Sequence, residues 1–190
     1  MPAVDIPRGP GRCPPVSDDT NSAGVKFDTN NEAVRFRSKA NHYEVAAKGG
    51  WQMREVSIAA AAVATLRATP VTLVAAPGAG NVLVFHQAAL ILDWVTPAFT
   101  ESADNLAVKY TDGSGLAVSE TIEATGFIDQ SADTLTFALP DAGAATAIAT
   151  KAQSENKALV LHNTGDGEFG GAGGSALRVK VWYSVVPSGW

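Results

Sequence analysis

Apolar and polar residues alternate along three stretches of the chain, and a period of two is typical of strands with one buried face. The last stretch has the clearest division, because Arg178, Lys180, Trp182 and Ser184 form its other face. The apolar positions, which we expect to be buried, are Leu106, Val108 and Tyr110; Leu135, Phe137 and Leu139; and Leu177, Val179, Val181, Tyr183 and Val185.

Residues 69–94 contain two apolar runs on either side of a turn-forming segment, residues 76–81. Pro77, Gly78 and Gly80 favour a tight reversal there, so the pattern predicts a hairpin in the core of the fold. The alanine-rich residues 59–64 are compatible with a helical turn or with an extended strand, because they are too few for a stable isolated helix.

Clusters of glycine and polar residues separate the apolar stretches, at residues 111–115, 165–167 and 170–174. Repeated short strands joined by such turns favour packed antiparallel sheets over a parallel α/β sheet. The sequence therefore predicts an all-β fold, with a jelly-roll or β-sandwich body over residues 51–190.

Residues 1–50 differ from the rest of the chain. Their first part is rich in proline, which fixes the backbone and removes hydrogen-bond donors, and polar turn formers follow. We expect an extended, proline-rich N-terminal arm. Its densest basic patch contains Arg35, Phe36 and Arg37, and this patch is either a short strand with a solvated basic face or a docking point for an acidic partner.

Composition and charge narrow the possible partners. The formal net charge is −5, and no dense Lys/Arg cluster is present, so we expect no specific nucleic acid as ligand. No apolar run reaches the length of a membrane helix, and the N-terminus lacks the apolar core of a secretory signal, so we expect no membrane partner. Cys13 is the only cysteine, which excludes an intrachain disulfide.

Residues with the spacing of a catalytic or metal site are not apparent. His42, His86 and His162 lie far apart in sequence, outside the spacings that place two imidazoles on one metal ion. Ser114 has glycine on both sides but lacks the wider pattern of a hydrolase nucleophile, and residues 77–81 lack the Lys-Ser/Thr pair of a phosphate loop. We therefore expect no enzymatic activity, no cofactor and no metal.

Tryptophans are the remaining candidates for a binding role. Trp182 stands on the polar side of its strand, where it is exposed, covered by a second apolar layer or buried in an interface. Trp51 begins the body. We assign partner binding to Arg35, Phe36, Arg37, Trp51 and Trp182; exposed rings that stack on sugars are the alternative.

Three segments, residues 66–80, 155–161 and 177–183, together resemble a β-domain of tailed-bacteriophage virion structural proteins, most of all capsid decoration (cement) proteins. The resemblance covers residues 54–187. It implies a non-enzymatic protein that is made in the host cytoplasm, binds the major capsid protein on the capsid surface of the virion and stabilises the head shell. It also implies self-association, with a trimer favoured and a dimer possible. A tail or fibre component used in attachment is the alternative, and a carbohydrate-binding module ranks behind it.

Overall fold

The computed structural model describes residues 24–28, 33–37, 42–45, 50–101, 104–141, 149–171 and 173–189. It divides the chain into two compact units, Met1–Ala47 and Lys48–Trp190. The first unit holds an antiparallel sheet of order β1-β2-β3, formed by β1 (Gly24–Asp28), β2 (Ala33–Arg37) and β3 (His42–Val45). The basic patch therefore lies on a strand. Residues 1–23, which carry the prolines of the expected arm, lie outside the described residues.

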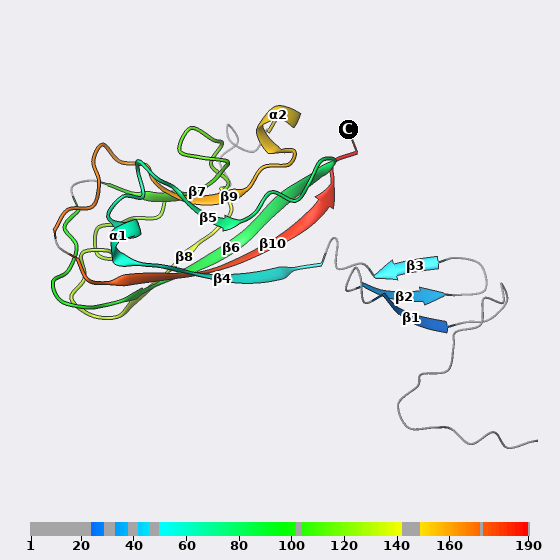
Figure 1. The fold of residues 1–190 in the computed structure, drawn as a ribbon, viewed down its shortest axis with the longest axis horizontal. Coiled ribbons are helices and arrows are strands. Elements are labelled where there is room, and N and C mark those ends of the chain that lie inside the picture. Colours follow the sequence, from blue (N-terminus) through cyan, green and yellow to red (C-terminus); the bar gives the residue numbers. More distant parts are fainter. Residues whose placement is uncertain are drawn as a thin grey trace, which may run out of the picture. The chain divides into compact units, whose positions relative to one another are not determined.

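The second unit, which we call the body, is all-β and consists of two antiparallel sheets, as the sequence predicted (Figure 1). The larger sheet has the order β4-β10-β6-β8 and the smaller one the order β5-β9-β7. The strands are β4 (Gln52–Ile58), β5 (Val71–Val74), β6 (Asn81–Asp93), β7 (Leu106–Tyr110), β8 (Thr134–Ala138), β9 (Leu159–Asn163) and β10 (Ala176–Pro187).

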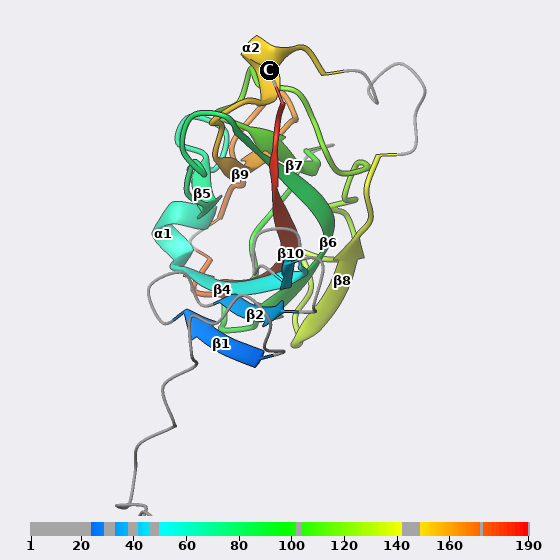
Figure 2. The same ribbon diagram turned by 90° about the vertical axis from the view of Figure 1, so that its right-hand side faces the viewer.

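Strand order identifies the body as a jelly roll. From β4 onward the chain alternates between the two sheets, except after β7, where residues 116–122 return along β7 in the same sheet. Isolated bridges join Lys109 to Ala117 and Leu106 to Ile122, so this segment occupies the position of an irregular eighth strand. When this segment is counted as a strand, the strand orders of the two sheets are those of a jelly roll, in which two Greek keys form a sandwich. Figure 2 shows the same layers from the side.

The expected hairpin over residues 69–94 is wrong, although both of its strands exist. β5 pairs with β9 in the smaller sheet, whereas β6 pairs with β10 and β8 in the larger one. The intervening segment therefore crosses between sheets. Gly78 (φ 92°) and Gly80 (φ 75°) adopt the left-handed backbone conformation that this reversal requires. The Gly80 N–H donates to the Glu155 carboxylate at 2.7 Å, which fixes the crossing.

The buried core confirms the expected inward face for two of the three alternating stretches, those that form β7 and β10. Leu177, Val179 and Val181 of β10 are fully buried, and they meet the buried apolar side chains of β7 and β9 across the space between the sheets. The alanine-rich segment resolves as a helix, α1 (Ala60–Val63), whose Val63 joins this core. A second short helix, α2 (Lys151–Ser154), begins with a capping box between Thr150 and Gln153.

In the remaining alternating stretch, which forms β8, the buried and exposed faces are the opposite of those expected. In β8 the small Ala138 is buried and pairs with Ala88 of β6, while Leu135 and Phe137 are 51% and 57% exposed. Leu139, just beyond the strand, is 50% exposed. The pairing with β6 decides which face points inward, and it directs the large side chains of β8 to the outside.

Tyr110 links the two sheets through the core. It is 6% exposed, and its hydroxyl donates to the Leu83 carbonyl oxygen of β6 at 2.5 Å. Burial raises the pKa of Tyr110 to about 12. Because the phenol of an unfolded chain has a pKa near 10, burial of the neutral form contributes stability below pH ~10 that is lost as the pH rises through 12.

We therefore expect Tyr110→Phe to lower the free energy of unfolding by about 1 kcal/mol at neutral pH, because one buried hydrogen bond is lost. The variant should also lose part of its sensitivity to alkaline pH. Urea unfolding measured at neutral pH and again above pH 10 checks both effects. An identical decline of wild type and variant at high pH would contradict this role for Tyr110.

Candidate binding surface

The outward-facing side of the larger sheet, which we call the outer face, is the most distinctive surface of the body. The strand register places its residues in rows that run across the four strands. Moving along β10, these rows are Ser57, Arg178, Ile91 and Leu135; then Glu55, Lys180, Ala89 and Phe137; then Met53, Trp182 and Gln87.

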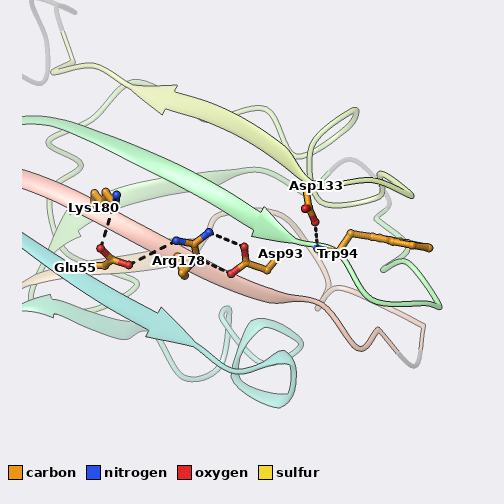
Figure 3. Close-up of polar contacts among 6 residues, drawn as sticks. All are labelled: Glu55, Asp93, Trp94, Asp133, Arg178 and Lys180. Carbon is orange, nitrogen blue, oxygen red and sulfur yellow. Dashed lines mark hydrogen bonds and ion pairs between the residues drawn. The ribbon is translucent and has the colours of Figure 1, made fainter.

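Charged side chains on the outer face neutralise one another along β4, β10 and the end of β6 (Figure 3). Arg178 makes a bidentate ion pair with Asp93, with Nε–Oδ2 and Nη2–Oδ1 distances of 2.6 and 2.8 Å. Glu55 lies 3.8 Å from both Arg178 and Lys180. The hydrogen bond from Arg178 lowers the pKa of Asp93. These partners are more than a third exposed, so they orient the surface more than they stabilise the fold.

Large apolar side chains flank this charged row. Met53 on β4 is 53% exposed, and Leu135 and Phe137 on β8 are exposed to a similar degree. Isolated exposed apolar residues are common on proteins, but large ones on both edge strands of the same sheet face make that face the candidate interaction surface. The outer face therefore has the composition of an interface, with apolar groups near paired charges.

Trp51 extends the outer face beyond the start of β4. Its indole is 67% exposed and stacks on the His86 ring, with centroids 4.4 Å apart and planes inclined by 9°. His86 Nε2 lies 2.9 Å from the Ser184 hydroxyl oxygen, so one end of the ring is held by β10. This contact presents one face of the indole in a fixed orientation.

The smaller sheet differs because the chain itself covers part of its outward side. Ala107 of β7 and Val160 of β9 are 4% and 2% exposed. His162, also on β9, lies beside Gly113 of the turn that follows β7, so close that a Cβ on Gly113 would collide with its ring. The two sheets therefore contrast: the smaller sheet buries the apolar side chains of its outward side, and the larger sheet presents large apolar side chains to solvent.

Near His162 lies an open cavity of about 390 Å³, lined by Arg67, Lys109, Gly113, Ser114, His162 and Thr164. Lys109 donates to the Gly113 carbonyl oxygen. Burial, assisted by the positive charge of Lys109, lowers the pKa of His162 and keeps its ring neutral at neutral pH. His162 is therefore a neutral side chain packed against the turn that follows β7.

Several carboxylates of the body hold the backbone in place. Glu168 accepts hydrogen bonds from the Arg67 and Ala68 N–H groups at 2.9 and 2.7 Å. Asp129 accepts from Gly126, and Asp133 from Trp94 (Figure 3). Among the described residues, no group of three or more His, Cys, Asp or Glu side chains could hold a metal ion. Within the same residues, no helix has the length and apolarity to cross a membrane.

Of the residues assigned to partner binding, Trp51 and Trp182 lie at the same end of the outer face, with Trp182 half-buried beside Met53. Arg35, Phe36 and Arg37 lie on β2 in the other unit, and their side chains are outside the described set. Sequence reasoning missed Met53, Leu135 and Phe137. No local signal identifies them, because their exposure depends on the pairing of distant strands.

The body is thus a jelly-roll sandwich with one exposed, partly apolar sheet face. A scan of protein-family models gives no match to the sequence, and neither does a search of curated proteins. Among solved structures, the chain is similar to one described as "Capsid of Ralstonia phage GP4", with 18% identity and a TM-score of 0.37 over 72% of this chain and 85% of that one. A TM-score of this size does not establish a common fold.

Proposed function

We propose that this protein is a non-enzymatic virion structural protein of a tailed bacteriophage, and that it decorates and stabilises the assembled head shell. The observation that carries the proposal is the outer face, which presents Trp51, Met53 and Phe137 to solvent. The likeness of residues 66–80, 155–161 and 177–183 to decoration proteins supplies the virion setting.

A protein of this kind stabilises the shell by binding the assembled form more tightly than its separated subunits. The outer face suits such binding, because aromatic and methionine side chains are enriched in interface cores. Arg178 and Lys180 are already paired with acidic neighbours, so docking would not leave isolated charges buried. The partner in this proposal is the major capsid protein, and the location is the capsid surface.

Particles made without the protein are expected to release their DNA at a lower temperature than complete particles, and added purified protein should restore the difference. A heat series followed by infectivity and by DNA release measures this. Equal heat resistance with and without the protein would refute the proposal. Gold-labelled antibody found on the tail would favour the alternative of a tail or fibre component.

A further inference from the structure

Of the four sheet edges that the described residues of the body form, three carry features that discourage pairing with another chain. The β4 edge carries the exposed charges of Arg54 and Glu55. The short β5 follows Pro70 and has a register shift between Thr72 and Val74. The irregular segment 116–122 keeps only isolated bridges to β7. Charges, prolines and irregularities are the usual means by which proteins protect sheet edges.

The fourth edge, β8, has none of these features. Thr134–Ala138 contains no charge and no proline, and all five residues pair with β6 without a register shift. Among the described residues, the backbone of this strand makes no hydrogen bond beyond those to β6. Its outward N–H and C=O groups therefore form a regular, uncharged template for another strand.

We infer that β8 pairs antiparallel with β8 of a second copy, about a two-fold axis that passes beside Thr136. This register uses all five residues of both strands. It places Leu135 opposite the partner's Phe137, and Phe137 opposite the partner's Leu135, all on the outer face. The two larger sheets then join into one eight-stranded sheet.

A second copy fits this edge because the strand is complementary to itself under a two-fold rotation. Each large side chain meets a large one, and the small Ala138 lies opposite Thr134. The chain has a net charge of −5, so two copies repel each other at most surfaces. An uncharged strand allows approach with the least repulsion. The contact is small, so we expect a weak dimer whose population rises with concentration.

The inference does not depend on the proposed function, because it concerns the free protein in solution. It predicts a dimer and excludes a trimer at this edge, since a two-fold contact closes with two copies. Sedimentation equilibrium of the full chain over a range of micromolar concentrations measures the state. A wild-type protein that stays monomeric, or that forms a trimer, would overturn the inference.

Charge substitutions test the register. In Leu135→Lys/Phe137→Lys, each lysine faces a lysine of the partner, and dimer affinity is expected to fall by roughly tenfold or more. In Leu135→Lys/Phe137→Glu, each lysine faces a glutamate, and dimerisation should return. Leu135 and Phe137 are exposed in the monomer, so we expect both variants to fold, and circular dichroism checks this.

Met53→Lys provides the control, because it adds one lysine at a similarly exposed position on the outer face, on the opposite edge strand. This variant should dimerise like the wild type. The inference fails if the double-lysine variant dimerises normally. It also fails if the lysine–glutamate variant dimerises as weakly as the double-lysine variant. Equal affinities would mean that residues 135 and 137 do not face each other across the contact.

Discussion

A protein with Trp51→Ala and Met53→Ala is expected to bind decoration-free particles at least about thirtyfold more weakly than the wild type. Truncation of a central interface aromatic costs about 2 kcal/mol or more, and 1.4 kcal/mol corresponds to a factor of ten. Both side chains are more than half exposed, so the fold should tolerate their loss. Co-sedimentation of labelled protein with particles measures the affinity.

Thr72→Ala is the control for this experiment. Thr72 is exposed on β5, in the smaller sheet, and its change should leave particle binding unaltered. If both proteins bind like the wild type, the particle contact lies elsewhere, and the outer face is not the surface that binds the shell. Equal weakening in both would indicate a loss of folded protein, which thermal unfolding of the two variants reveals.

Gly115→Ala is expected to produce the largest loss of stability, about 2–4 kcal/mol. A Cβ at this position would collide with the Tyr110 carbonyl oxygen, which is main chain and cannot rotate away. The Tyr110 N–H donates to the Leu116 carbonyl oxygen at 2.9 Å, so relief of the collision would also strain the pairing of β7 with residues 116–122. Urea unfolding measures the change.

Gly50→Ala is the matched control for Gly115→Ala, because a Cβ at position 50 would meet nothing within 4 Å. It should shift stability by no more than about 0.5 kcal/mol, as expected for a surface site. A Gly115→Ala protein as stable as Gly50→Ala would show that the turn after β7 can rearrange without cost.

Alternation predicted strands correctly but did not always predict the buried face. In β7 and β10 the large residues point inward, as Val108 and Val179 illustrate. In β8 they point outward, because the register with β6 places Ala138 and Thr136 on the interior side. A period of two determines that one face differs from the other; partner strands determine which face meets the core.

Connectivity was the second limit. The glycines of residues 76–81 indicate a chain reversal, and the structure contains one. A reversal within one sheet and a crossing between two sheets need the same local residues. Only the long-range pairs, β5 with β9 and β6 with β10, distinguish them.

The candidate surface was therefore predicted in part. Tryptophans are conspicuous in a sequence, and two of them lie on the outer face. Its methionine, leucine and phenylalanine resemble core residues until the pairings are known. The expected absence of a metal-binding pattern rested on histidine and cysteine spacing, which a sequence displays directly.

The position of β10 has a consequence for the synthesis of the protein. This strand lies between β4 and β6, and within the part of the chain that the structure describes β4 pairs with no other strand. Residues 52–58 therefore stay unpaired until β10 has been synthesised, and the ribosome adds more than a hundred residues before that point. Such long-range closure slows folding and leaves apolar strands open during translation. The body cannot assemble stepwise behind the ribosome, so chaperones that bind nascent chains have a long interval in which to act.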